Sequence, residues 1–271
     1  MRLRDKRRLA QAAAFLACNM GFTAATQTGL VAPFMFCHGC PLASFACPIG
    51  ALQHFLGAHT APLFLTGFLA LAFLVLGRAA CGWLCPFGAL QDLLARLAGI
   101  GKAKGPPSAL RLARLDRAAR KAKFLVLLGT IAGSWALAGT TFCWFCPVGA
   151  LFAGIPYKLT HMDTRLGLLF YAHLAVLALV LVIALLLPRA WCRYACPLGA
   201  IAGLFNRLSL IGIELDRDKC VGCGACLEAC PMGLRSLDDI GTSVECILCG
   251  RCAEACPTGA LRLSLLAGSR E

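Results

Sequence analysis

Eight cysteines near the end of the chain constrain its fold more than any other feature. They form two copies of one run. In each copy, three cysteines are separated from one another by two residues, and a fourth cysteine follows after three more residues and precedes a proline. This spacing supplies the four thiolates of a [4Fe–4S] cube, and in paired runs the fourth cysteine of each run binds the other cube. Zinc sites and disulfides are the alternatives, but zinc knuckles lack a doubled run of four cysteines. The predicted ligand sets are Cys220, Cys223, Cys226 and Cys256 for one cube, and Cys246, Cys249, Cys252 and Cys230 for the other.

The composition indicates an integral membrane protein. Hydrophobic residues make up 59% of the chain and charged residues only 14%, whereas about a quarter of the residues in a typical soluble domain are charged. The 26 lysines and arginines outnumber the 13 aspartates and glutamates. These basic residues flank apolar stretches and are not interleaved with aromatic residues on one surface, so we expect membrane lipid as a partner and no nucleic acid.

Four apolar stretches approach the roughly 20 residues that a helix needs to cross a membrane. We interpret the first as a retained helix and not as a signal peptide, because no small-residue cleavage site follows it. Its polar residues, including Gln11 and Asn19, suggest that it packs inside the bundle. The sequence therefore predicts an all-α membrane bundle of four transmembrane helices, followed by a small α+β domain with two clusters. The stretches are Leu9–Phe34, Ala61–Leu76, Phe124–Phe142 and Leu166–Leu187.

The distribution of basic residues predicts the orientation. Five lysines and arginines precede the first stretch and ten lie between Arg78 and Lys123, but the two opposite loops contain only Lys158 and Arg165. Loops rich in lysine and arginine stay in the cytoplasm. We therefore expect a multi-pass protein of a bacterial or archaeal cytoplasmic (inner) membrane, with both termini in the cytoplasm, where clusters are assembled under reducing conditions.

A Cys-Pro-x-Gly-Ala element occurs four times, once after each apolar stretch. Its cysteines are Cys47, Cys85, Cys146 and Cys196. In the predicted topology the first and third elements are outer and the second and fourth are inner, which makes the membrane part an internal repeat of two hairpins. The expected domains are a first hairpin repeat (1–100), a basic cytoplasmic linker (101–123), a second hairpin repeat (124–212) and a cytoplasmic two-cluster domain (213–271).

The repeated element favours metal ligation or thiol redox chemistry. Proline at the first helical position puts the preceding cysteine at the N-cap, where unpaired N–H groups and the helix dipole are expected to lower its pKa. A second cysteine lies just upstream of most of these elements. We predict one further [4Fe–4S] cube on an inner set and another on an outer set, with Cys37 as an alternative ligand in the outer set; redox-active dithiols or outer disulfides are the rival interpretation. The inner set is Cys81, Cys85, Cys192 and Cys196, and the outer set is Cys40, Cys47, Cys143 and Cys146. Cys18 stands apart from these motifs and is expected to be a small buried residue.

The segments Cys81-Gly-Trp-Leu-Cys85-Pro-Phe-Gly-Ala-Leu and Trp191-Cys192-Arg-Tyr-Ala-Cys196-Pro-Leu-Gly-Ala-Ile, followed by the doubled cysteine run, resemble the membrane polyferredoxins. That family includes the quinol-dehydrogenase membrane subunit of periplasmic nitrate reductase and the membrane half of the nitrous-oxide reductase regulator. The resemblance extends from the first apolar stretch to Thr258. It implies a ferredoxin-like C-terminal domain and electron transfer between a quinone or a cytoplasmic donor and an acceptor outside the membrane. The outer cysteines depart from the nitrate-type pattern.

We therefore expect a membrane electron-transfer protein that relays single electrons between its redox partner proteins, either as a generic conduit or as an oxidoreductase component such as a quinol dehydrogenase subunit. Two hypotheses from other classes stay open at this point. One is a transmembrane thiol–disulfide reductant exporter that uses the Cys-Pro pairs as dithiols, and the other is a sensor or assembly factor. The five histidines fall toward the outer side, where water-accessible loops or a role in accepting quinol protons are the two interpretations. They are His38, His54, His59, His161 and His173.

Overall fold

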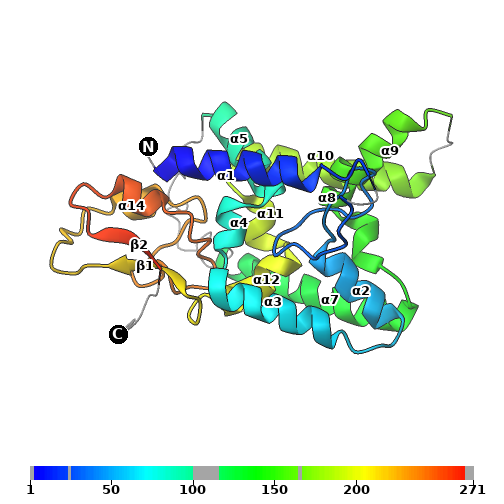
Figure 1. Cartoon of the computed structure of the whole chain (residues 1–271). Coiled ribbons are helices and arrows are strands. Elements are labelled where there is room, and N and C mark those ends of the chain that lie inside the picture. Colours follow the sequence, from blue (N-terminus) through cyan, green and yellow to red (C-terminus); the bar gives the residue numbers. More distant parts are fainter. Residues whose placement is uncertain (1–2, 24–25, 100–115, 164–166, 266–271) are drawn as a thin grey trace.

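The structure is a computed structural model that describes residues 3–23, 26–99, 116–163 and 167–265. It is rich in helices and has one small sheet (Figure 1). The longer helices are α1 (Leu3–Cys18), α2 (Pro48–Gly57), α3 (Leu63–Leu76), α5 (Pro86–Leu97), α7 (Ala122–Leu137) and α10 (Leu168–Leu186). The shorter helical elements are α4 (Ala79–Trp83), η1 (Thr141–Phe145), α8 (Pro147–Gly149), η2 (Ala150–Gly154), α9 (Ile155–Thr160), α11 (Ala190–Tyr194), α12 (Pro197–Leu204), α13 (Ala225–Glu228) and α14 (Arg251–Ala255).

The longer helices separate two ends of the molecule. Helices α1, α3, α7 and α10 extend broadly along one direction, with β1, β2 and α14 at one end and α2, α8 and α9 toward the other (Figure 1). Elements of the two predicted hairpin repeats pack across each other, because α2 contacts α7 and α5 contacts α10. A core of buried apolar residues, which includes Phe36, Phe73 and Leu198, lies between them.

Helix α10 matches its predicted stretch closely, and within the described residues it is the one helix long and apolar enough to cross a membrane by itself. The predicted stretch at 61–76 forms the apolar but shorter helix α3. The stretch at 124–142 forms α7, which ends at Leu137 before the short turn η1. Helices α3 and α7, with 14 and 16 residues, are shorter than the roughly 20 residues that a helix needs to cross a membrane. The four-span bundle therefore stays a prediction.

The first apolar stretch was expected to be one helix to Phe34, and this expectation is wrong. Helix α1 ends at Cys18, where the Asn19 side chain donates a hydrogen bond of 2.7 Å to the Phe15 carbonyl. The chain then turns at Gly21, where a Cβ would lie 2.8 Å from the Ala43 carbonyl oxygen. The described residues from Asn19 to Cys47 contain no further helix. Cys18 is buried, as expected for an isolated small residue.

The chain after the last helix hairpin forms a small α+β unit. Strands β1 (Ile211–Leu215) and β2 (Leu261–Leu265) pair in antiparallel fashion, with Ile211 opposite Leu265 and Leu215 opposite Leu261. This ladder joins the two ends of the segment that carries the eight cysteines. Most of the predicted linker, at residues 101–115, lies outside the described residues, as does Arg165. The domain boundaries therefore stay predictions.

Candidate metal centres

The eight C-terminal cysteines line two adjoining cavities in the two predicted sets. One cavity is lined by the three cysteines that begin the first run together with Cys256, and the other by the three that begin the second run together with Cys230. Cys226 borders both cavities, so the two sites are neighbours. Within the described ranges, no three cysteine, histidine, aspartate or glutamate side chains are arranged to hold a single metal ion. Four cysteines around one cavity supply the four thiolates that a multi-iron cube requires.

Glycine permits the tight loops around these cavities. Gly222, Gly224 and Gly250 have φ of 70°, 74° and 74°, a left-handed conformation that is costly for other residues. Gly224 and Gly250 are the N-cap residues of α13 and α14. In each run, this short helix carries the third cysteine. The two sites differ in exposure, because Cys223 of the first set is exposed whereas Cys246, Cys249 and Cys252 of the second are buried.

The four Cys-Pro elements have the predicted local structure. Each cysteine precedes a proline that begins a helix, and the thiols of Cys47, Cys85 and Cys196 accept hydrogen bonds from the glycine N–H three residues later at 3.3–3.4 Å. The expected lowering of the thiol pKa is wrong. Burial raises the pKa of Cys47 to about 12, and burial likewise raises the pKa of Cys85, although the glycine N–H groups act in the opposite direction. Ligation of a metal would therefore displace protons from these sites.

The inner set lies together between the two half-repeats. All four thiols are buried, and their charges would interact with one another, since each of Cys85 and Cys196 faces both Cys81 and Cys192. Burial raises the pKa of the Cys81 thiol, and the charge of Arg78 is the largest opposing influence. The inner set therefore combines four cysteines from α4, α11 and the N-caps of α5 and α12 in one buried place.

Two buried arginines cross between the half-repeats at the inner set. Arg78 Nη2 donates to the Cys192 carbonyl at 3.2 Å, and Arg189 Nη1 donates to the Cys81 carbonyl at 2.7 Å. Each arginine precedes the first inner cysteine of its own half by three residues and packs on the glycine of the opposite Cys-Pro-x-Gly turn: a Cβ on Gly199 or Gly88 would lie 2.9 Å from the guanidinium. These reciprocal contacts are what a two-fold relation between the halves predicts.

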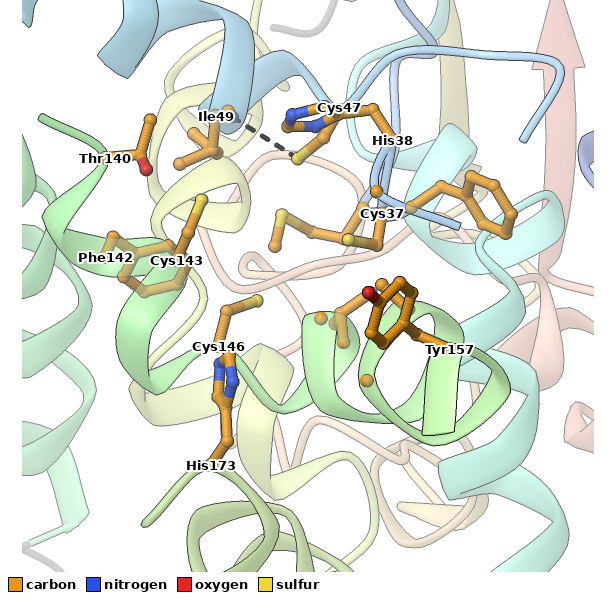
Figure 2. A pocket seen from close by; sticks show the side chains of 18 of the residues that line it. Cys37, His38, Cys47, Ile49, Thr140, Phe142, Cys143, Cys146, Tyr157 and His173 are labelled. Carbon is orange, nitrogen blue, oxygen red and sulfur yellow. Dashed lines mark hydrogen bonds between the residues drawn. The ribbon is translucent and has the colours of Figure 1, made fainter. Parts of the chain in front are cut away.

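Most cysteines of the outer set border a cavity of about 390 Å³. Cys37, Cys47, Cys143 and Cys146 line it, and Figure 2 shows them around one central space. The structure differs here from the expectation that Cys40 is the fourth ligand, because Cys40 is absent from the described lining and its thiol lies 3.9 Å from Asn19 Oδ1. The tight turn in which the Cys40 N–H donates to the Cys37 carbonyl directs the two side chains to different surroundings.

Two fully buried glutamines form equivalent contacts in the outer and inner sets. Gln53 Nε2 donates to the Cys143 thiol at 3.4 Å, and Gln91 Nε2 donates to the Cys192 thiol at 3.5 Å. The side-chain oxygen of each glutamine accepts the backbone N–H of the residue before that cysteine, at 2.8 Å from Phe142 and 3.1 Å from Trp191. Each glutamine therefore fixes a cysteine that belongs to the opposite half-repeat.

The roles of these glutamines and arginines were not predicted from the sequence. The available signal was their position, since each glutamine follows its Cys-Pro cysteine by six residues in the first half-repeat. Of the five histidines, His38 and His173 line the outer cavity and lie near its cysteines in Figure 2, whereas His54, His59 and His161 do not line it.

A buried carboxylate, Asp92, and a partly buried one, Asp116, connect the C-terminal domain to the helices. Asp92, on α5, lies 2.7 Å from Arg189 Nη2, 3.1 Å from Arg251 Nη2 and 3.6 Å from Arg7 Nη2. Burial opposes ionisation of Asp92, but these arginines lower its pKa.

Asp116 contacts Arg120, Arg193 and Arg235 and accepts a hydrogen bond from the Tyr194 hydroxyl. Burial would raise the pKa of this carboxyl, but the hydrogen bonds from Tyr194 and Arg120 lower it to about 2.

The four cysteine sites follow one another without a gap. The Met35 carbonyl lies 3.9 Å from the Cys85 thiol, and Met35 also lines the outer cavity, so one residue separates the outer from the inner set. On the other side, Cys81 and Cys192 pack with Cys249 and Cys230 in one buried cluster. None of the eighteen cysteines, all of which lie in the described residues, forms a disulfide in the structure.

The residues present fit anionic iron–sulfur clusters. The Arg78 side chain is fully buried, its Nε has no hydrogen-bond partner, and no described carboxylate pairs with it. A buried, unpaired cation is unfavourable, and a cube held by four thiolates would supply the missing negative charge. When bound, such a cube accepts and releases one electron at a time.

These features define an iron–sulfur protein, and comparison with known proteins identifies its family. A family model described as a 4Fe-4S binding domain matches residues 44–60, 58–104, 123–159 and 169–214, and a 4Fe-4S dicluster domain matches residues 219–260. The chain therefore belongs to the 4Fe-4S binding, or polyferredoxin, family, and it binds multiple [4Fe–4S] clusters.

Its relatives include proteins named for ferredoxins and electron transport. The chain is 32% identical over 176 residues to YccM of Escherichia coli, whose name describes electron transport (63% of this chain, 46% of YccM). It is 29% identical over 188 residues to the methylamine utilization ferredoxin-type protein MauN of Methylorubrum extorquens (68% and 59%), and 29% identical over 193 residues to the ferredoxin-type protein NapH of Escherichia coli (68% and 59%). The chain spans about half to three-fifths of the length of such relatives. No solved structure matches it.

Proposed function

We propose that this chain is a membrane relay in which four [4Fe–4S] cubes carry single electrons between the cytoplasm and the outer side. The observation that carries the proposal is the contiguity of the four cysteine sites. Cys226 borders both C-terminal sites, Cys249 packs against the inner cysteines, and Met35 separates the inner from the outer set. A function that used the C-terminal cubes alone would have no need of this continuous series.

The proposed ligand sets follow the geometry. The C-terminal cubes take the two crossed sets, and the inner cube takes Cys81, Cys85, Cys192 and Cys196. The outer cube takes Cys37, Cys47, Cys143 and Cys146, which revises the expected set by one residue. The chain's own groups then shape each site: glycine N–H groups and the glutamine amides donate to sulfur, and the buried surroundings exclude water.

Exposed apolar side chains support the proposed membrane location. Leu168 is 87% exposed, Phe64 is 88% exposed, and only 17% of the most apolar part of α10 is buried. A soluble protein rarely exposes large apolar patches. We propose that α3, α7 and α10 contact lipid, that the predicted four domains apply, and that both termini are cytoplasmic, as the excess of basic residues in the N-terminus and the 78–123 segment indicates.

The proposed partners are redox proteins on the two sides of the membrane. The site that contains Cys223 is the most exposed of the four, which makes it the place where a cytoplasmic partner would exchange electrons. The family resemblance adds a quinone as a partner in the membrane. An apolar cavity of about 330 Å³ between α1 and the segment around Pro33 is the proposed place for the apolar part of such a quinone.

The test is the iron content of anaerobically purified full-length protein, together with that of single cysteine variants. We expect about sixteen Fe per chain, since each cube contains four. Cys47→Ser should remove about four Fe, whereas Cys40→Ser, a matched change three residues from Cys37, should remove none. About eight Fe in the wild-type protein would restrict the clusters to the C-terminal domain and refute the relay. Labelling of Cys47 and Cys146 only after mild reduction would instead indicate a disulfide system.

A further inference from the structure

Buried cations of the described chain pair with carboxylates, with one exception. Arg7 and Arg189 pair with Asp92, and Lys123 pairs with Glu245. Arg193 and Arg120 pair with Asp116. Arg78 is as deeply buried as any of these, but none of the described carboxylates lies within ion-pair distance of it. Such a charge is costly unless another group compensates it.

One nitrogen of the Arg78 guanidinium, Nη1, donates to the Val244 carbonyl at 2.5 Å, and its other contacts lie at the inner set. Its guanidinium donates to the carbonyl of Cys192, packs on Gly199 in the turn that follows Cys196, and lies beside the thiol of Cys81. Its backbone N–H donates to Asn206 Oδ1 at 2.9 Å, which holds the residue in place. The guanidinium therefore lies beside the Cys81 thiol, the Cys192 carbonyl and the turn that follows Cys196.

We infer that Arg78 is the counter-charge of the inner cube and raises that cube's reduction potential. The inference rests on the proposed function, because it requires a cube on the inner set. Reduction adds one electron to a cluster that is already anionic, and a nearby fixed cation stabilises the reduced form more than the oxidised form. The attraction is strong because the surroundings are buried and the effective dielectric constant is low.

The outer set lacks such a charge. None of the described residues that line its cavity is a lysine, arginine, aspartate or glutamate. Arg78 is thus a positioning and potential-setting residue for the inner cube and not for the outer cube, which serves as an internal reference in the same molecule. Both sites receive a hydrogen bond from a glutamine side-chain amide to a cysteine sulfur. The nearby charge, and not hydrogen bonding alone, therefore distinguishes the two sites.

The experiment is a redox titration of the full-length protein, followed by electron paramagnetic resonance, with iron counted in each sample. Cys85→Ser identifies the inner signal by its loss. Arg78→Gln should then lower the midpoint potential of that signal and leave the outer signal unchanged. We expect the ratio of reduced to oxidised inner cube at the wild-type midpoint to fall at least tenfold, which corresponds to about 59 mV for a one-electron couple. Arg78→Lys, which keeps the charge, should restore most of the potential.

The matched control is Arg207→Gln, which removes one positive charge from an exposed position near the same segment. Its potential should equal that of the wild type, because solvent screens exposed charges. An unchanged inner potential in Arg78→Gln with full iron content would overturn the inference. If Arg78→Gln loses the inner iron, Arg78→Lys decides: retention of iron and potential supports a role of the charge, and equal loss overturns it. A wild-type protein without an inner signal would refute the proposed function itself, before any arginine variant is measured.

Discussion

Replacement of Asp92 by asparagine should destabilise the whole assembly, because this one carboxylate joins four segments. Its side chain is 2% exposed and pairs with Arg189 at 2.7 Å, Arg251 at 3.1 Å and Arg7 at 3.6 Å. These partners belong to the second half-repeat, the C-terminal domain and α1. Asparagine keeps the shape but leaves buried guanidinium groups without a counter-charge, a change that costs about 3–5 kcal/mol.

The assay is loss of visible cluster absorbance on heating in detergent, read as an apparent midpoint temperature. With about 2–4 °C for each kcal/mol in a chain of this size, Asp92→Asn should lower the midpoint by about 10 °C. The matched control is Asp238→Asn, which breaks an ion pair with Arg217 in which the side chains are 68% and 76% exposed. Exposed pairs contribute about 0–1 kcal/mol, so this midpoint should barely move. Equal midpoints for the two variants would refute the reasoning that Asp92 holds the segments together.

Three further predictions concern the inner set and its surroundings. Cys85→Ser should remove about four Fe and leave the other centres intact, as measured by iron analysis, and full iron content would contradict the inner ligand set. Gln91→Leu removes the N–H···S hydrogen bond to Cys192, so the midpoint potential of the inner cube should fall while its iron is retained. An unchanged potential would mean that this hydrogen bond does not reach a ligand of the inner cube. Burial raises the pKa of Asp116 but hydrogen bonds from Tyr194 and Arg120 lower it to about 2. Since the folded value is below the usual pKa of about 3.9, the stabilisation from Asp116 should be present above about pH 4 and decline as the pH falls toward 2. Protease resistance of wild type and Asp116→Asn should therefore converge at low pH, and a constant difference would contradict this.

Local spacing made the C-terminal sites predictable. Cysteines separated by two residues stay in one loop whatever the rest of the chain does, and the crossover of Cys230 and Cys256 follows from pairing the two runs. The N-cap position of the Cys-Pro cysteines was predictable for the same reason, because proline at the first helical position acts on its immediate neighbours.

Hydrophobicity alone led to the wrong prediction that the first apolar stretch is one helix as far as Phe34. Val31, Ala32 and Phe34 are apolar because they pack in or against the core formed with the outer elements, and not because they continue α1. A count of apolar residues cannot separate a buried loop from a helix. The same limit explains the choice of Cys40, since two cysteines three residues apart in a turn point to different places, and only the turn geometry decides between them.

The contacts that cross between the halves could not be read from local sequence. Arg78 and Gln91 serve cysteines more than a hundred residues away, and Asp92 pairs with partners from both ends of the chain. These are tertiary interactions, so their signal would be an equivalent position in each half-repeat, as for Arg78 and Arg189, or in successive elements, as for Gln53 and Gln91.

Electron transfer across a sealed bilayer tests the central proposal most directly. The protein would be reconstituted in vesicles with ferricyanide inside and a membrane-impermeant reductant outside, and reduction of the ferricyanide would be followed for molecules in each orientation. The relay predicts rapid reduction by the wild-type protein and a rate at the level of protein-free vesicles for Cys146→Ser, with the C-terminal clusters retained. Equal rates for the wild type and Cys146→Ser, or no reduction by a wild-type protein that holds all its iron, would contradict the relay.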